Sequence, residues 1–288
     1  MPQELTAPRD PRRTPARPDL AAAGLEGVVA AARYVAGEVR RVAVPVAPLC
    51  RRPAGDAPLE TQALHGESVR VFEDDGEGWS WVQLEADLYV GYMPTDALAP
   101  LALPPTHQVC ALRTFVFPGP DIKLPPREAL VAGSRVMVGE VRGAFAVTPE
   151  GFLPWVHLCA LGEREADFVA VAARYLGVPY LWGGRSSLGI DCSGLVQAAL
   201  AAAGLMAPRD SDMQEAELGA PVPLDAPVRR GDLLFWPGHV AIAEDADTLL
   251  HANAFHMMVA REGRAEALAR IADAGLSLRA IRRLPQPR

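Results

Sequence analysis

The sequence lacks paired cysteines. Its four cysteines stand far apart, and none belongs to a CxxC motif; they are Cys50, Cys110, Cys159 and Cys192. Four cysteines among 288 residues are too sparse for a disulfide framework, so we expect reduced thiols. The cysteine and histidine spacings also match no zinc-ligand pattern, and we expect neither a metal nor another cofactor.

Positive charge is scarce relative to negative charge. The net charge at pH 7 is −7, and the isoelectric point is about 5.4. A surface with this balance repels nucleic acids and anionic membranes. We therefore expect no nucleic-acid partner and no membrane partner.

Long apolar runs are missing as well. The first twenty residues contain proline, arginine and aspartate, but no apolar stretch of the kind found in secretory signals. The uncharged run 193–208 has only sixteen residues and includes glycine and glutamine, so it is too short and too polar to span a bilayer. These observations favour a cytoplasmic protein.

Apolar spacing divides the chain into a β-rich part and a mixed part. Within an N-terminal extension over residues 1–40, apolar residues near helical spacing predict a helix over Leu20–Val39. Short apolar bursts between turn signals then predict two small barrels, over residues 41–102 and 103–161. In the first barrel, residues 74–78 separate two alternating runs, as a β-hairpin or a β-arc would.

From residue 162 to 288 the pattern is typical of an α+β domain. Helical spacing begins at Glu163, and an alanine-rich helix follows Cys192 and ends near Gly204. A loop is expected over 205–227. Alternating and apolar runs predict strands over 228–236, 239–243 and 248–253, followed by a charged helix near 262–274 and a last strand near 278–284.

The segment Asp191-Cys192-Ser193-Gly194 places a cysteine in the first turn of the alanine-rich helix. The positive end of the helix dipole and nearby backbone N–H groups favour a thiolate, which is the reactive form of cysteine. A buried structural cysteine is the common alternative. However, Asp191 and Ser193 are poor neighbours for a dry core position, and Gly194 permits close approach of backbone or substrate. Cys192 is therefore the candidate nucleophile, whereas the other three cysteines lie in apolar, strand-like runs.

Two histidines follow on neighbouring predicted strands. His239 begins an alternating run, in which an imidazole can face a cleft while Val240 and Ile242 pack below it. His239 is the candidate base that takes the thiol proton and later protonates a leaving amine. His251 is in register to hold the second nitrogen of that imidazole and so to fix its tautomer. The alternatives are a surface histidine and a half-buried histidine with a backbone partner. A cysteine and two histidines in this order are typical of a thiol hydrolase.

Residues 163–288 resemble the NlpC-type cysteine peptidases, which have a papain-like core. The resemblance rests on the motifs PYLWGG, DCSGLV, GDLLFW, GHVAI and LLHAN, and on the order cysteine, histidine, histidine. It implies that Cys192 is the nucleophile, His239 the base and His251 the orienting residue. Tyr180 matches the family tyrosine that points at the thiol and helps to bind the oxyanion, and the Cys192 N–H would be the other donor. A core aromatic is the alternative for Tyr180, and Trp182 is interpreted as one.

The N-terminal half resembles the bacterial SH3-like domains that accompany this peptidase. The implied fold is α+β, with a papain-like peptidase core preceded by two SH3-like barrels. One subgroup of three-domain, cytoplasmic enzymes carries an Arg-Asp-Ser signature after the catalytic helix, and here residues 209–211 match it. In that subgroup a glutamate and a tyrosine of the first barrel close the cleft. Glu67 and Tyr92 match them, although Tyr89 is close in sequence and the usual following Gly-Trp is absent.

The same resemblance implies a substrate site beside the nucleophile. Asp210 would bind a free ammonium group of the substrate. Ser193 and Ser211 would hydrogen-bond the peptide, and Asp191 is placed in the same site. The alternatives are an ordinary helix cap for Asp210 and a solvated turn charge for Glu67.

The implied activity is hydrolysis of the γ-D-glutamyl–diamino acid bond in murein peptides with a free N-terminal L-Ala, as in cell-wall peptide recycling. The alternatives are an exported hydrolase of intact peptidoglycan, a non-catalytic binding protein that uses the barrels, and an amidase or acyltransferase on the same core. The partner would be a murein-derived peptide. The sequence does not distinguish lysine from diaminopimelate, nor one oligomeric state from another.

Overall fold

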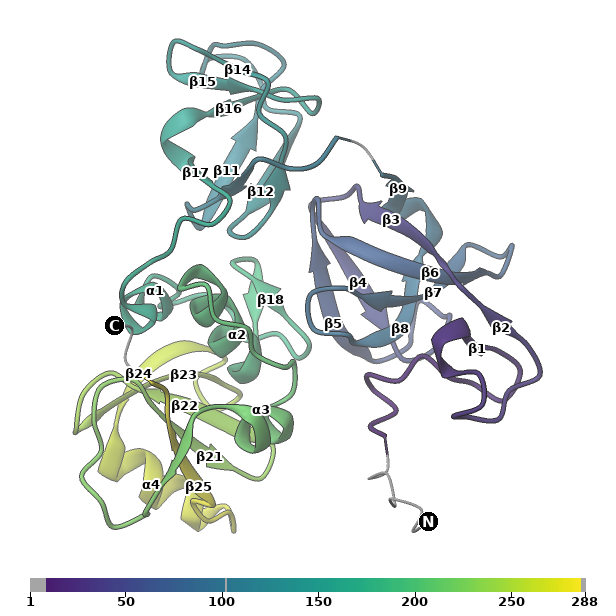
Figure 1. Ribbon diagram of the computed structural model, residues 1–288. Coiled ribbons are helices and arrows are strands. Elements are labelled where there is room, and N and C mark those ends of the chain that lie inside the picture. The colour runs from purple at the N-terminus through teal and green to yellow at the C-terminus, as the bar shows by residue number, and fades with distance from the viewer. Residues whose placement is uncertain (1–8, 102, 286–288) are drawn as a thin grey trace. The chain divides into compact units, whose positions relative to one another are not determined.

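The computed structural model describes residues 9–101 and 103–285. The chain divides into two compact units, residues 1–104 and 105–288, and each is described by itself (Figure 1). Residues 1–8 of the predicted extension, residue 102 at the predicted barrel boundary and residues 286–288 lie outside the described part.

The first unit is built on a seven-stranded antiparallel sheet with the order β5-β4-β8-β7-β6-β3-β9. Its strands are β3 (Glu38–Val42), β4 (Val46–Cys50), β5 (Leu59–Leu64), β6 (Ser68–Asp74), β7 (Trp79–Leu84), β8 (Val90–Pro94) and β9 (Leu98–Pro100), and the 3-10 turn η2 (Thr95–Ala97) precedes β9. Alternate residues of β6, Val69 and Val71, are buried in its core. The predicted hairpin is confirmed, because β6 pairs with β7 and Asp75 accepts hydrogen bonds from the N–H groups of Glu77 and Trp79.

The predicted helix over Leu20–Val39 is wrong. The segment holds two short parallel strands, β1 (Ala21–Ala22) and β2 (Tyr34–Val35), with one 3-10 turn, η1 (Ala23–Leu25), between them. Gly27 and Gly37 have φ angles of 75° and 71°, which a right-handed helix does not accommodate. Burial also outweighs the helical spacing, because Leu20 is fully buried with Phe72 and Trp81.

Residues 105–161 form three small antiparallel sheets with the orders β13-β10-β17, β11-β12 and β14-β15-β16. The strands are β10 (His107–Val109), β11 (Arg113–Val116), β12 (Glu128–Val131), β13 (Arg135–Val136), β14 (Glu140–Arg142), β15 (Phe145–Val147), β16 (Phe152–Pro154) and β17 (Leu158–Ala160), and the 3-10 turn η3 (Trp155–His157) precedes β17. One apolar core joins the three sheets, with Val109, Leu130 and Leu153 among its members.

The rest of the second unit is a six-stranded antiparallel sheet with helices on both faces (Figure 1). The order is β20-β25-β21-β22-β23-β24, with β20 (Ala220–Val222), β21 (Asp232–Trp236), β22 (His239–Ala243), β23 (Thr248–Asn253), β24 (Met258–Gly263) and β25 (Ala280–Arg283). The helices are α1 (Phe168–Ala173), α2 (Cys192–Ala202), α3 (Ser211–Glu217) and α4 (Arg264–Asp273), and a small hairpin of β18 (Arg185–Ser186) and β19 (Gly189–Ile190) precedes α2. Alternation along β21 serves both faces, because Leu233 and Phe235 pack with α1 and α2 while Leu234 and Trp236 pack with α4.

The predicted strands that carry the two histidines are confirmed. β22 and β23 have the predicted bounds of 239–243 and 248–253. The predictions around them are less accurate: β24 was not expected, the charged helix begins at Arg264, and α3 occupies part of the expected loop over 205–227. No helix in the described residues is long and apolar enough to cross a membrane.

Candidate active site

Cys192 is the first residue of α2 and is buried. Asp191 is the N-cap of this helix, and its Oδ1 accepts a hydrogen bond of 2.7 Å from the N–H of Gly194. A Cβ atom at position 194 would overlap the carbonyl oxygen of Gly184, so only glycine fits there. The close approach expected at Gly194 is therefore a contact between two backbone segments, and it presses the start of α2 against the preceding loop.

A buried ion pair fixes the same helix start. Arg209 is 1% exposed and donates to both carboxylate oxygens of Asp191, at 3.0 Å to Oδ1 and 2.5 Å to Oδ2. Asp191 Oδ2 also accepts a 2.8 Å hydrogen bond from Gly183 N–H, and Arg209 donates at 2.8 Å to Ser193 Oγ. A bidentate arginine–carboxylate pair of this kind fixes orientation as well as distance.

This network changes the interpretation of two predicted substrate-binding residues. Internal donors occupy both oxygens of Asp191, and the hydroxyl of Ser193 is buried against Arg209. Both residues hold α2 in place and are engaged within the protein. Sequence reasoning assigns no role to Arg209, although its position in the Arg-Asp-Ser motif was the available signal.

The thiol of Cys192 is neutral in this environment. Burial raises its pKa to about 12, and the negative charge of Asp191 acts in the same direction. Backbone N–H groups of Val240 and Ser193 and the charge of Arg209 lower the pKa, but their effect is smaller. The expectation of a resting thiolate is therefore wrong, because desolvation outweighs the helix terminus.

Three strands and one helix, β22, β23, β24 and α4, each contribute one side chain to a chain of four polar groups. His239 Nε2 lies 3.0 Å from His251 Nδ1, and His251 Nε2 lies 3.0 Å from Glu262 Oε2 on β24. Arg270 of α4 donates to both oxygens of Glu262, at 2.8 Å and 2.7 Å. A continuous polar chain therefore runs from His239 through the sheet to α4. Sequence reasoning missed Glu262 and Arg270 because it assigned both to a charged helix near 262–274 and gave neither a partner.

Both imidazoles are neutral at neutral pH. Burial lowers the pKa of His239 to about 3 and that of His251 to about 4, from an ordinary value of 6.5. A neutral imidazole has a lone pair for a proton, so His239 is chemically competent as a general base.

The thiol meets β22 directly beside His239. Cys192 packs in the same core as Val240, whose N–H is hydrogen-bonded to the sulfur. Within residues 9–101 and 103–285, the side-chain hydrogen bond of His239 goes to His251 rather than to the sulfur. Because hydrogen bonds between catalytic groups often tighten only when substrate binds, this adjacency is the geometry expected before binding.

Tyr180 lies beside the same helix start. It forms an isolated bridge with Ile190 and packs half-buried against the core of α2. Burial, followed by electrostatic interactions with Cys192 and Asp191, raises the pKa of its phenol to about 12. Tyr180 is therefore a protonated hydrogen-bond donor. Trp182 is 67% exposed, so its interpretation as a core aromatic is wrong.

Asp210 and Ser211 lie at the start of α3. Asp210 occupies the N-cap position, but its side chain makes no capping hydrogen bond, which argues against an ordinary helix cap. Gln214, one turn later, donates to the carbonyl oxygens of Ser193 and Pro208 at 3.0 Å and 2.9 Å. This amide ties α3 to α2, so the start of α3 is fixed relative to Cys192.

Glu67 and Tyr92 belong to the first unit. Glu67 is 6% exposed, and its carboxylate accepts a 2.9 Å hydrogen bond from Leu64 N–H, so it is not a solvated turn charge. Tyr92 of β8 accepts a 3.0 Å hydrogen bond from Arg17, whose guanidinium lies 4.5 Å from the ring centroid of Trp81. Their part in a site with Cys192 stays a prediction.

Two further features bear on what the described residues could bind. His251, His256 and Glu262 each offer a ligand atom, and these atoms lie within 4.8 Å of one another, but the guanidinium of Arg270 places a positive charge where a metal ion would bind.

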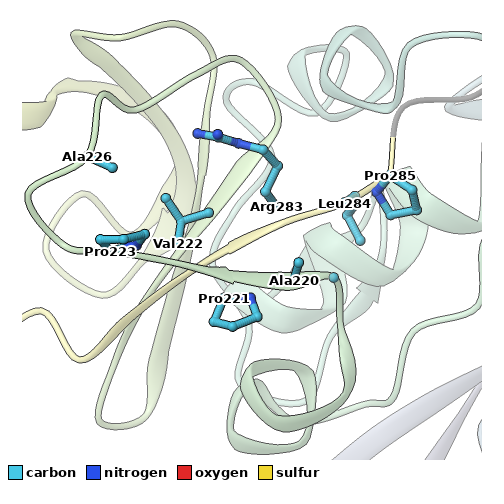
Figure 2. Close-up of a pocket in the computed structure, with 9 residues that line it drawn as sticks. Ala220, Pro221, Val222, Pro223, Ala226, Arg283, Leu284 and Pro285 are labelled. Carbon is cyan, nitrogen blue, oxygen red and sulfur yellow. The ribbon is translucent and has the colours of Figure 1, made fainter.

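A pocket beside β20 and β25 is lined by Val222, Pro223, Arg283 and their neighbours (Figure 2). None of the described residues that line it belongs to the candidate catalytic set.

A buried thiol at a helix start, a neutral imidazole beside it and a polar chain behind that imidazole define a thiol hydrolase. Comparisons with known proteins agree. The model of the NlpC/P60 family matches residues 177–268, and the model of the bacterial dipeptidyl-peptidase Sh3 domain matches residues 49–98.

Two relatives and one solved structure extend this match. Dipeptidyl-peptidase 6 of Lysinibacillus sphaericus is 30% identical over 233 residues, which cover 72% of this chain and 85% of that protein. The γ-D-glutamyl-L-lysine dipeptidyl-peptidase of Bacillus subtilis is 47% identical over 197 residues, which cover 63% and 65%. A crystal structure of an NlpC/P60 family protein from Bacillus cereus has a TM-score of 0.73 at 20% identity and covers 87% of this chain and 100% of that chain, which shows the shared fold.

This chain therefore belongs to the NlpC/P60 family and is a cysteine peptidase with an SH3-like domain near its N-terminus. The resemblance to NlpC-type peptidases is confirmed. The second SH3-like barrel and the roles of individual residues stay predictions.

We predict that Arg209→Met lowers the free energy of unfolding by about 3–5 kcal/mol, because Asp191 is left as a buried charge without its cation. Urea denaturation measures this loss. The matched control is Arg174→Met, whose pair with Glu165 is exposed at 44% and 39% and is worth at most about 1 kcal/mol. Equal losses for the two variants would contradict the role given to the buried pair.

The acid limb of kcat/KM is expected well below the ordinary histidine value of 6.5. The sign follows from the lowered pKa: between pH 6.5 and the pKa of about 3, His239 stays neutral and keeps its lone pair. A peptidase assay across the acid range measures the midpoint. A half-maximal rate near pH 6.5 would show that His239, with its lowered pKa, is not the base.

Proposed function

We propose that this protein hydrolyses the γ-D-glutamyl–diamino acid bond of murein peptides that carry a free N-terminal L-Ala. The main observation in favour of hydrolysis is the contact between His239 and His251, because it orients a neutral base on the strand that meets Cys192. The substrate is supported by the 47% identity to a relative named for γ-D-glutamyl-L-lysine. The matched domain described for bacterial dipeptidyl-peptidases supports it independently.

The reaction begins with a neutral thiol and a neutral imidazole. As the sulfur of Cys192 attacks the γ-carbonyl carbon of D-Glu, its proton passes to His239 and the carbonyl electrons move to oxygen. Tyr180 O–H and Cys192 N–H donate to that oxyanion. When the intermediate collapses, the C–N bond breaks and the leaving amine takes the proton from His239.

Deacylation repeats the proton transfers with water. His239 takes a proton from water as the oxygen attacks the thioester carbon. The C–S bond then breaks, His239 returns the proton to sulfur, and L-Ala-D-Glu leaves. His251 holds the imidazole of His239 in one orientation during both halves of the cycle.

Asp210 is the partner proposed for the substrate ammonium. Asp210 is a half-buried acidic residue at the N-terminal end of α3, the helix that Gln214 ties to the catalytic helix. Ser211 follows it and would hydrogen-bond the peptide. For Glu67 and Tyr92 of the first unit we propose a role in binding the substrate, as the resemblance implies.

The proposed architecture has three domains: barrels over residues 41–102 and 103–161, and the peptidase over residues 162–288. The shared apolar core of the three small sheets supports a separate barrel over the middle segment. We propose that the enzyme acts in the cytoplasm on free peptides during cell-wall recycling, without a membrane or nucleic-acid partner. The net charge of −7 supports the absence of polyanionic partners.

Incubation with L-Ala-γ-D-Glu-L-Lys and with its N-acetylated form tests the substrate proposal. We expect the free peptide to yield L-Ala-D-Glu and lysine. Acetylation is expected to lower kcat/KM by about tenfold to a hundredfold, because it removes the charge-assisted hydrogen bond of the substrate ammonium. Cys192→Ser provides the blank, with a loss of at least about 10³-fold. Equal cleavage of both peptides would exclude recognition of the free amine, and cleavage only of intact peptidoglycan would favour the exported-hydrolase alternative.

Asp210→Asn separates recognition from chemistry. We expect KM for the free tripeptide to rise about tenfold to a hundredfold with little change in kcat, because the carboxylate contacts the ammonium and not the reacting atoms. The control is Asp225→Asn, which removes one negative charge from an exposed loop position. An unchanged KM for Asp210→Asn would assign the ammonium to another acid.

A further inference from the structure

The polar chain behind His239 ends in a fixed negative charge. Glu262 faces His251 on one side and Arg270 on the other, and its side chain is only 8% exposed. The side chain of His251 is fully buried between them. Glu262 lies on β24 and Arg270 on α4, so two elements without a predicted catalytic residue reach the base from behind.

The donor and acceptor types along this chain fix its direction. The hydrogen bonds from Arg270 lower the pKa of Glu262, so its carboxylate is ionised and only accepts hydrogen bonds. His251 Nε2 must then carry a proton and donate it to Glu262. Because His251 is neutral, its Nδ1 has a lone pair and accepts from His239 Nε2. This assignment leaves Nδ1 of His239 without a proton.

The opposite direction would disable the base. If His251 Nδ1 donated to His239 Nε2, the proton of a neutral His239 would lie on Nδ1, which would have no lone pair for the thiol proton. The two histidines by themselves do not choose between these directions, because each ring has one donor and one acceptor in either case. The carboxylate of Glu262 selects one direction, because it lies at the far end of the chain and can only accept a hydrogen bond.

We infer that Glu262, held by Arg270, is a positioning residue that sets the tautomer of the catalytic base through His251. This inference rests on the proposed function, because it takes His239 to be the catalytic base. During acylation the thiol proton reaches His239 Nδ1, and the carboxylate two rings away balances the positive charge. Arg270 keeps that carboxylate from taking the proton itself, so the proton stays where the leaving amine needs it.

The charged groups around the two rings predict opposite effects on acid titration. His251 is faced by His239 on β22, Glu262 on β24, Arg270 on α4 and His256 after β23; His239 is faced by His251 and, at a greater distance, by Glu262 and Arg270. The charge of Glu262 raises the pKa of both rings, and that of Arg270 lowers it. Glu262→Gln should therefore move the acid limb of kcat/KM to lower pH, and Arg270→Gln should move it to higher pH.

The main test is Glu262→Gln, which keeps the size of the side chain and removes its charge. The new amide can present N–H to His251, which reverses the chain. We expect kcat to fall about 10²–10⁴-fold with little change in KM, as when a catalytic histidine is left in the wrong tautomer.

The matched control is Glu244→Gln. Glu244 directly follows β22 and is bound by Arg261 of β24 at 2.6 Å and 2.7 Å, but it touches no histidine. Its kcat is expected within about twofold of the wild type.

Two measurements need no peptide substrate. Nitrogen NMR of histidine-labelled protein should show His239 protonated at Nε2 in the wild type and in Glu244→Gln, and at Nδ1 in Glu262→Gln. Alkylation of Cys192 by iodoacetamide should slow with the same variant, since the thiol loses its base. If the wild type fails to cleave the tripeptide, the proposed substrate falls, while NMR and alkylation still decide the role of Glu262.

Two results would overturn the inference. One is a Glu262→Gln variant with wild-type kcat and an unchanged His239 tautomer. The other is a shift of the acid limb in the same direction for Glu262→Gln and Arg270→Gln. If Glu262→Gln does not fold, Arg270→Gln alone decides, because an acid limb that stays in place or moves to lower pH contradicts the proposed charge balance.

Discussion

The bidentate ion pair between Arg209 and Asp191 is the constraint on which the candidate site depends. It is buried, and it joins the loop before α2, the first turn of α2 and the segment before α3. A buried charge without a partner is costly, so neither residue can move without the other. Cys192 follows Asp191 directly in the chain, so the ion pair also fixes the position of Cys192. The peptide-binding residues proposed at the start of α3 are tied to the same point through Gln214.

Burial decides the electrostatic character of the site. Cysteine at a helix start is often read as a thiolate, because the helix terminus stabilises negative charge. Here burial makes a lone charge on sulfur unfavourable, and burial also lowers the pKa of the two imidazoles, which are therefore neutral. Catalysis by such a pair moves the proton at the moment of attack. The fixed negative charges lie on Asp191, which precedes Cys192, and on Glu262, which lies beyond His251, and each is balanced by one arginine.

The sequence predicts those parts of the molecule where local pattern and tertiary packing agree. β22 and β23 have the expected bounds because each is a short, mostly apolar run between turns, and the histidines on them are within hydrogen-bond distance. Leu20–Val39 fails because helical spacing of small apolar residues competes with glycines at positive φ and with burial against the sheet.

The parts that sequence reasoning missed are long-range electrostatic partners. Arg209, Glu262 and Arg270 are charged residues in segments that resemble exposed loops or helix surface, and only the fold shows that their partners lie 18, 11 and 8 residues away in sequence. Charge alone does not reveal burial. The expected thiolate failed for the same reason, since the degree of desolvation at Cys192 depends on the sheet packed against it.

Consecutive residues of β22 serve opposite faces of the sheet. Val240 and Ile242 pack with α2, whereas Ala241 and Ala243 pack with α4. His239, the first residue of the strand, precedes Val240, whose N–H meets the sulfur, and it contacts Trp236 and His251. Because side chains alternate strictly along a strand, inserting or deleting one residue in the tight turn between β21 and β22 would exchange these faces. Changes of chain length at this turn would therefore disturb the site far more than changes of side chain. The number of residues between Trp236 and His239 fixes which side chains of β22 face the site.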